Sequence, residues 1–189
     1  MAMNIWDVNW FLDEEQCPCD VHFLQYLEQE QITGASIFHF GTGGHHIVGI
    51  RSAENGSNNT VLGITASPQE YDDYVKLVIE RPEIGRIYKA FFGDIYQLDA
   101  RLLPEFDLVT LFHTGEFRTE QNDAYGALTD LEVAELLVGK LKAGGRVLFF
   151  AGSFAFDKAE AVAAQLVARR LVTAEADYKA LRVYRKVAS

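Results

Sequence analysis

Short apolar runs that alternate with longer helical patterns limit the fold of this chain more than any other feature. The runs occupy residues 37–40, 61–65, 86–92, 106–112 and 146–151. Nearly continuous apolar runs are typical of strands buried on both faces, as in parallel sheets. Alternation of such strands with helices predicts a three-layer α/β sandwich.

The segments between the runs carry helical signals. Helices are expected over residues 20–30, 67–80, 129–141 and 157–170. The second has Ser67 as its cap, Pro68 in its first turn and Glu70 near the positive end of its dipole. The third is expected to stop at 142–145, where a lysine precedes two glycines. The tail, 171–187, predicts two short strands with a turn near Asp177-Tyr178.

Length and charge narrow the class of protein. The 189 residues predict a single domain, 1–189, and no run approaches the ~18 apolar residues that a membrane helix needs. A net charge of −10 opposes binding to nucleic acid or to anionic membranes. Cys17 and Cys19 flank one proline, so a disulfide between them could not link distant segments of the chain. We therefore expect a reduced, cytoplasmic protein.

A glycine-rich turn, Gly41-Thr42-Gly43-Gly44, follows the first apolar run. Glycines allow a sharp turn and a close approach of a ligand to the backbone, and the next helix offers free N–H groups. Ligands of parallel α/β sheets bind beyond the carboxyl ends of the strands. The turn is a candidate binding loop, although a plain strand-to-helix connection also explains it.

The order of the elements adds to this signal. Gly93-Asp94-Ile95 follows the third run, and the stretch Leu141-Lys142-Ala143-Gly144-Gly145 precedes the fifth. Over roughly residues 20–187, this arrangement resembles the class I S-adenosylmethionine-dependent methyltransferases. The resemblance implies a doubly wound, Rossmann-like sheet of about seven strands, mostly parallel with an antiparallel C-terminal strand.

The resemblance also implies S-adenosylmethionine as the cofactor. The glycine-rich turn would hold its methionine part, and Asp94 would face the adenine amino group. The residues expected to bind the cofactor are His39, Gly41, Thr42, Gly43, Gly44, Thr65, Asp94 and Ile95.

The sequence departs from the family at three places. His39 stands where the family has an acid, and His45 stands at its third glycine. The second strand ends at Thr65 without the acid that binds the ribose hydroxyls, and the next carboxylate is Glu70. Because hydrogen bonds to charged groups are about twice as strong as neutral ones, we expect cofactor binding to be weaker, rearranged or absent.

Histidines form a second constellation. His39 and His113 end strands that are neighbours in the resembling fold, so both rings are expected in one cleft. We predict that His113 or Glu116 takes a proton from the methyl acceptor, while His39 orients the glycine-rich turn. The alternatives are polar cleft lining, and a transition-metal site that uses histidines with Cys17 and Cys19, near which His22 also lies. No metal site is predicted outright.

The N-terminal segment, 1–30, is rich in aromatic residues. Trp6, Trp10 or Phe11 could cover the cleft as a helical lid, or could form an interface with a second copy of the chain, a homodimer. A plain N-terminal helix packed on the domain explains the segment equally well. The predicted function is a small methyltransferase acting on a small-molecule acceptor. Two alternatives remain: a non-catalytic protein of the same fold that binds a nucleotide-like ligand or a partner, and a metal-dependent enzyme that uses the histidines.

Overall fold

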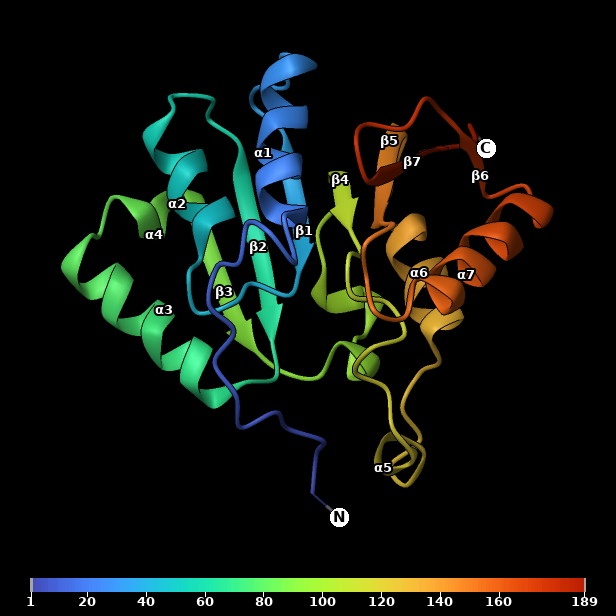
Figure 1. Ribbon diagram of the computed structural model, residues 1–189, viewed down its shortest axis with the longest axis horizontal. Coiled ribbons are helices and arrows are strands. Elements are labelled where there is room, and N and C mark those ends of the chain that lie inside the picture. The colour runs from blue at the N-terminus through green and yellow to red at the C-terminus, as the bar shows by residue number, and fades with distance from the viewer. Residues whose placement is uncertain (1, 189) are drawn as a thin grey trace.

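A seven-stranded sheet in the order β3-β2-β1-β4-β5-β7-β6 forms the centre of the computed structural model, which describes residues 2–188 (Figure 1). The strands are β1 (Ser36–Phe40), β2 (Thr60–Thr65), β3 (Tyr88–Phe92), β4 (Phe106–Thr110), β5 (Leu141–Phe150), β6 (Val172–Ala174) and β7 (Leu181–Lys186). The pairs are parallel except those that β7 makes with β5 and β6. The predicted doubly wound sheet with an antiparallel C-terminal strand is therefore confirmed.

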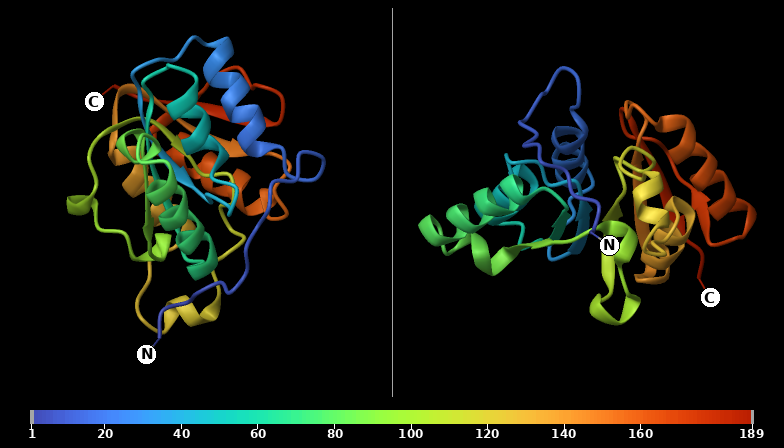
Figure 2. Two further views of the ribbon diagram at one scale, coloured as in Figure 1. Left: turned by 90° about the vertical axis from the view of Figure 1, so that its left-hand side faces the viewer. Right: turned by 90° about the horizontal axis from the view of Figure 1, so that it is seen from below.

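Helices cover both faces of the sheet, as the two views of Figure 2 show. One face packs against α1 (Cys19–Gln29), α2 (Ile47–Glu54), α3 (Pro68–Glu80) and α4 (Ile84–Ile87). The other packs against α6 (Asp130–Gly139), α7 (Phe156–Ala168) and the short turn η1 (Ile95–Gln97). The chain also forms η2 (Ala100–Leu102) and α5 (Glu120–Asp123). Each face buries its own apolar cluster, which makes the predicted three layers.

Most expected elements are present, and their caps match the sequence signals. The hydroxyl of Ser67 accepts the N–H of Glu70 at the start of α3. Thr129 and Glu132 form a reciprocal capping box at the start of α6. The third expected strand is shorter than predicted, because Arg86 lies in α4 and β3 begins at Tyr88.

The expected helix end at 142–145 is wrong. Helix α6 ends at Gly139, and β5 already begins at Leu141, which pairs with Phe106. The next pair between these strands joins Leu108 to Arg146, so β5 carries extra residues between the two pairs. A Cβ atom at Gly145 would lie 2.9 Å from the carbonyl oxygen of Asp107. The glycines therefore allow a bulge in a strand, rather than cap a helix.

Residues 4–18, here called the strap, are not helical, so the prediction of a helical lid is wrong in its secondary structure. Instead the segment runs across the carboxyl ends of the parallel strands (Figures 1 and 2). The Trp6 N–H donates to the Ala66 carbonyl (3.1 Å), and the Gly44 N–H donates to the Trp10 carbonyl (2.8 Å). The hydroxyl of Ser67 donates to the Val8 carbonyl (2.6 Å). These bonds to loops replace the internal bonds of a helix.

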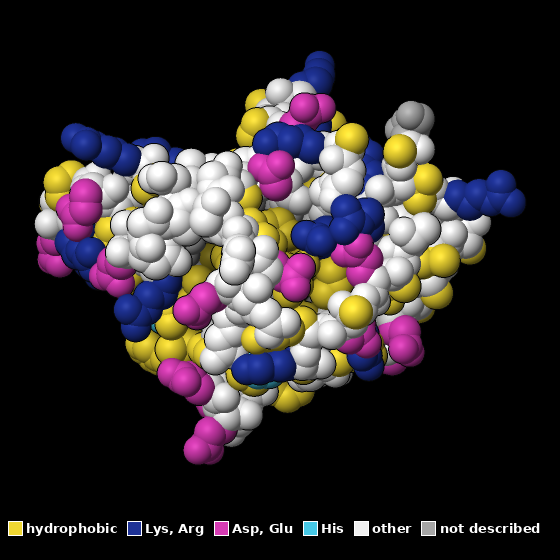
Figure 3. Space-filling model, turned by 90° about the horizontal axis from the view of Figure 1, so that it is seen from above, with side chains coloured by type: hydrophobic (Ala, Val, Ile, Leu, Met, Phe, Trp, Pro, Cys, Tyr) yellow, Lys and Arg dark blue, Asp and Glu magenta, His cyan; other side chains and the backbone are white. Residues whose placement is uncertain are grey.

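The surface and the helices give two further observations. Across residues 2–188, no helix has the length and apolar character needed to cross a membrane. The face seen from above shows Lys and Arg side chains scattered among Asp and Glu, with no continuous basic patch (Figure 3).

Candidate functional site

A cavity of about 310 Å³ opens at the carboxyl ends of β1, β2, β3 and β4. The strap, the start of α1 and the start of α3 also line it. Of the residues expected to bind a cofactor or acceptor, the cavity is lined by Gly41, Gly43, Thr65, Asp94, Ile95, His113 and Glu116. His39, Thr42 and Gly44 are not among its lining residues. The topology thus brings together residues from four separate strand ends.

The glycine-rich turn needs its glycines for two different reasons. Gly41 has a φ of +85°, and a Cβ atom there would lie 2.6 Å from Cδ2 of His113. Gly44 has an ordinary φ, but a Cβ atom there would lie 1.8 Å from Oδ1 of Asn9 in the strap. The turn is therefore packed against His113 on one side and against the strap on the other.

His39 does not reach the cavity, contrary to the sequence-based prediction. The side chain is only 1% exposed. Its Nδ1 atom lies 2.7 Å from the hydroxyl oxygen of Thr110, and its Nε2 atom lies 3.5 Å from Oδ1 of Asp20. The ring therefore joins β1 to β4 and α1, and its hydrogen bonds do not include the glycine-rich turn.

Asp20 is a site residue that the sequence did not reveal. It is buried in the first turn of α1, lines the cavity, and also lies 3.7 Å from Nε2 of His45. Burial alone favours the neutral acid, but the His39 and His45 rings outweigh it and lower the pKa of Asp20 below its ordinary value. The acid missing from the end of β1 is thus supplied from another element, and no sequence motif marks it.

The end of β2 also obtains a carboxylate from elsewhere. The hydroxyl of Thr65 donates to Oε2 of Glu70 at 2.6 Å, and the Trp10 N–H donates to Oε1 at 3.4 Å. Glu70 is only 2% exposed but borders the cavity. Burial raises the pKa of this carboxyl group above its ordinary value.

Asp94, after β3, is held by three donors. Oδ1 accepts the N–H of Tyr96 at 2.9 Å. Oδ2 accepts the hydroxyl of Tyr125 at 2.5 Å and the amide of Asn122 at 2.8 Å. A carboxylate has about four lone-pair positions, so one remains for a ligand in the cavity.

His113 follows β4 and lies at the centre of a polar group. Its Nδ1 atom is 3.1 Å from Oε2 of Glu116, whose other oxygen accepts the Ser153 hydroxyl at 2.5 Å. Its Nε2 atom is 3.9 Å from Sγ of Cys19, and that sulfur is 3.4 Å from Sγ of Cys17. Burial opposes a charged ring, yet Glu116 outweighs it and raises the pKa of His113. The pKa of Cys17 falls to about 7, mainly through its hydrogen bond with Cys19.

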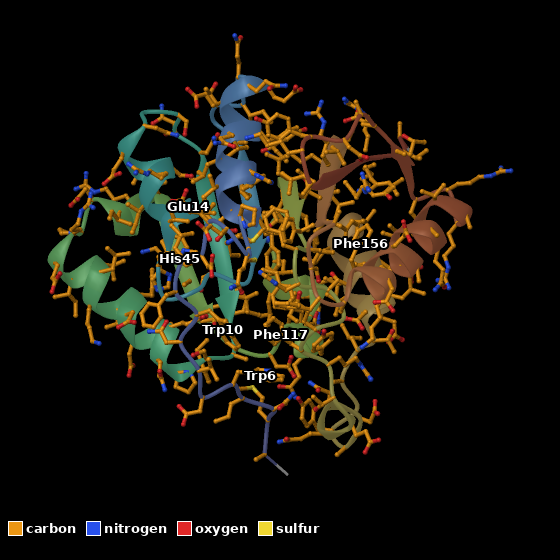
Figure 4. The ribbon with its side chains drawn as sticks, in the orientation of Figure 1. Trp6, Trp10, Glu14, His45, Phe117 and Phe156 are labelled. Carbon is orange, nitrogen blue, oxygen red and sulfur yellow. The ribbon has the colours of Figure 1, made fainter. Side chains whose placement is uncertain are left out.

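An aromatic group closes the cavity on the strap side. The ring centroid of Phe117 lies 5.2 Å from that of Trp6 and 5.4 Å from that of Trp10, and both pairs are in edge-to-face contact. Figure 4 shows these three side chains gathered at the carboxyl ends of the strands, with His45 lying apart from them near the start of α2. The predicted covering role of the tryptophans thus has a structural basis, although the segment is extended.

The charge of the cavity wall has one sign. Five carboxylates lie among its lining residues: Asp13, Asp20, Glu70, Asp94 and Glu116. No Lys or Arg is found among the described residues that line it. Such a wall favours cationic ligands and disfavours phosphates.

Comparison with known proteins identifies the fold. No protein-family model and no curated protein matches the sequence. The structure is similar to that of N-methyltransferase NodS from Bradyrhizobium japonicum WM9 in complex with S-adenosyl-L-homocysteine, with a TM-score of 0.63, 14% identity, and coverage of 95% of this chain and 92% of NodS. An rRNA methylase from Streptococcus thermophilus gives a TM-score of 0.60 at 14% identity, covering 89% and 97% of the two chains.

The [4+2]-cyclase SpnF is a further neighbour, with a TM-score of 0.53, 18% identity, and coverage of 78% of this chain and 51% of SpnF. The chain therefore has the fold of the class I methyltransferases. Because identities this low carry no activity across, reaction and substrate must be argued from the site.

Proposed function

We propose that this protein is an S-adenosylmethionine-dependent methyltransferase with a small-molecule acceptor. The observation that carries the proposal is the wall of the cavity at the carboxyl ends of β1 to β4, which is partly aromatic and holds five carboxylates but, among the described residues, no Lys or Arg. S-adenosylmethionine is a nucleoside that carries a sulfonium and an ammonium group and no phosphate. Carboxylates and aromatic faces attract such cations. A phosphate-bearing nucleotide would meet repulsion at the same wall, so we rank it below S-adenosylmethionine.

The chain's own residues would hold the cofactor as follows. Asp94 keeps one lone-pair position for the adenine amino group, since its other partners are Tyr96, Asn122 and Tyr125. Glu70 would accept from the ribose hydroxyls, in place of the acid missing from the end of β2. Gly41 and Gly43 line the cavity, and their backbone would face the methionine part.

The acceptor would bind between His113 and the aromatic group of the strap. S-adenosylmethionine, when bound, supplies an electrophilic methyl group. The wall formed by Trp6, Trp10 and Phe117 would exclude water and hold the acceptor against that methyl group. His113 and Glu116 are the polar residues on this side, and the role of either as proton acceptor remains a prediction. A net charge of −10 supports a small molecule over a nucleic acid.

Calorimetry with the full chain tests the proposal. S-adenosylmethionine and S-adenosylhomocysteine should both bind, and ATP should bind far more weakly at the same concentration. Glu70→Gln should weaken both cofactor forms, whereas Glu80→Gln, at the far end of the same helix, should not. If neither cofactor form binds at millimolar concentration, the methyltransferase proposal is wrong. Binding of ATP instead would favour the non-catalytic alternative.

A further inference from the structure

We propose that Cys17, Cys19 and His113 form a zinc site whose open position faces the cavity. Their three ligand atoms all lie within 4.8 Å of one another. The two sulfurs are 3.4 Å apart, and Sγ of Cys19 is 3.9 Å from Nε2 of His113. All three residues also line the cavity. The site is therefore defined by three convergent side chains rather than by a sequence spacing.

Two of the three separations between ligand atoms are close to those of a tetrahedral zinc site, and the third lies within 4.8 Å. With Zn–S distances of about 2.3 Å and Zn–N of about 2.0 Å, tetrahedral angles place two sulfurs about 3.8 Å apart and a sulfur about 3.6 Å from the nitrogen. The sulfur pair at 3.4 Å and the sulfur–nitrogen pair at 3.9 Å each differ from these values by a few tenths of an ångström. Rotation of the cysteine side chains can supply movements of that size.

The ring of His113 is oriented as a ligand ring should be. Its Nδ1 atom is paired with Oε2 of Glu116 at 3.1 Å, and Glu116 is itself held by Ser153 at 2.5 Å. When Nδ1 donates its proton to this carboxylate, the lone pair of Nε2, which lies 3.9 Å from Sγ of Cys19, is free for a metal ion. A carboxylate behind a histidine ligand fixes the tautomer and strengthens the ligand in metalloproteins.

The backbone also holds the ligands in place. Gly41 packs so closely on His113 that a Cβ atom would lie 2.6 Å from Cδ2 of the ring. Pro18 stands between the two cysteines and fixes one backbone angle there. The third ligand comes from a position 94 residues further along the chain than Cys19. The site thus ties the strap and α1 to the end of β4.

The ligand set selects the metal. Two thiolates and an imidazole suit zinc and exclude magnesium or calcium, which prefer oxygen. Three protein ligands with a fourth position open are typical of reactive zinc sites rather than structural ones. An ion here would bind a hydroxyl or thiol and lower its pKa. That last step rests on the proposed function, because the group it would activate is the methyl acceptor.

A zinc ligand and a free general base both need the lone pair of Nε2, so His113 cannot be both at once.

Elemental analysis of the full chain, purified with the thiols reduced, should find about one zinc ion per molecule. The stripped protein should recover one ion on titration with zinc, and cobalt in its place should give thiolate charge-transfer bands.

Variants make the test specific. Cys17→Ser, Cys19→Ser and His113→Gln should each weaken zinc binding by about 100-fold or more, and Glu116→Gln by about 10- to 100-fold, through the orientation of the ring. His22→Gln is the matched control, because His22 is near the cysteines in sequence but does not belong to the cluster of three ligand atoms. Circular dichroism checks that each variant folds. Cys17→Ser should disturb folding least, because Cys17 is only half-buried.

The proposal is overturned if the reduced protein binds no zinc at micromolar concentration, or if Cys17→Ser and His113→Gln bind zinc as tightly as the parent. Calorimetry with S-adenosylhomocysteine on stripped and zinc-loaded protein separates this result from the proposed function. Zinc binding without cofactor binding would support the metal site and contradict the methyltransferase. Cofactor binding without zinc, together with loss of turnover in His113→Gln, would leave His113 as the general base.

Discussion

Nε2 of His39 lies 3.5 Å from Oδ1 of Asp20, and both side chains are buried. Where the class I methyltransferases, whose fold this chain shares, usually have an acid at the end of β1, this chain has His39, and a carboxylate on α1 faces it. Because the two residues come from different elements, their contact fixes α1 against the sheet. The start of α1 carries two cavity residues, Asp20 itself and Cys19.

Loss of this contact should destabilise the protein. Asp20→Asn is expected to lower the free energy of unfolding by about 1–3 kcal/mol, because the buried His39 ring loses a charged partner. Urea denaturation measures this change. Asp72→Asn, on the exposed side of α3, is the control and should have little effect. Equal stability of the two variants would show that the pair contributes nothing to the fold.

Glu70 should lower stability at neutral pH. Its pKa is raised in the folded state, so the folded chain binds more protons than the unfolded chain between the ordinary pKa of 4.5 and the higher folded value. Stability therefore falls as pH rises through that window. Glu70→Gln should remove this fall and raise the melting temperature at pH 7, while cofactor binding weakens. A melting temperature that falls at pH 7 would contradict this sign.

Two glycines allow the clash at His113 to be measured separately from backbone strain. Gly41 and Gly56 both have positive φ values, +85° and +69°, but a Cβ atom at Gly56 meets nothing within 4 Å. Gly56→Ala should therefore cost only the left-handed backbone penalty, roughly 1–2 kcal/mol. Gly41→Ala should cost more, because it also displaces the His113 ring. Thermal unfolding of both variants gives the difference, and equal losses would mean that the ring moves freely.

Asp94 is expected to be a cofactor residue rather than only a structural one. Asp94→Ala should weaken binding of S-adenosylhomocysteine by about 1–3 kcal/mol, the cost of leaving a buried donor without its partner. Asn122 and Tyr125 also lose a partner, so a loss of stability should accompany it. Calorimetry below the melting temperature of the variant separates the two effects. Asp72→Ala is the control, and equal affinities would remove Asp94 from the site.

The strap should slow the exit of a bound ligand. Trp10→Ala removes one edge-to-face contact with Phe117, worth about 0.5–1.5 kcal/mol or roughly a 2- to 12-fold change. We expect faster dissociation of S-adenosylhomocysteine in stopped-flow measurements, with little change in the association rate. Leu102→Ala, a large exposed side chain outside the cavity lining, serves as the control. Unchanged dissociation would mean that the strap does not cover the ligand.

The fold could be predicted because local patterns determine it. The apolar runs of β1, β2 and β4 are short, as in strands buried on both faces of a sheet, and the caps at Ser67 and Thr129 mark two helix starts. The end of α6 was wrong because glycines terminate helices and form strand bulges equally well. Only the pairing of Leu141 with Phe106 separates these cases, and a pairing is not a local property.

The site could be predicted only in part, for the same reason. Residues that directly follow strands, such as Gly41, Asp94 and His113, line the cavity as expected. Asp20 and Glu70 were not assigned to the site because each reaches it from a helix, where an acid in the first turn also suits the helix dipole. The prediction that His39 reaches the cavity was wrong, because the alternation of residues along β1 does not tell which face of the sheet a given side chain occupies.

The strap joins the cavity through main-chain bonds at Trp6, Val8 and Trp10, and so the wall of the pocket is built by the chain's first residues. Most of the sheet's apolar core would survive their loss. A form that lacks residues 4–18 is therefore expected to keep its circular dichroism spectrum and yet to bind ligands of the cavity more weakly. Folding and competence to bind would then be separable properties of this molecule, with the boundary between them near Cys19.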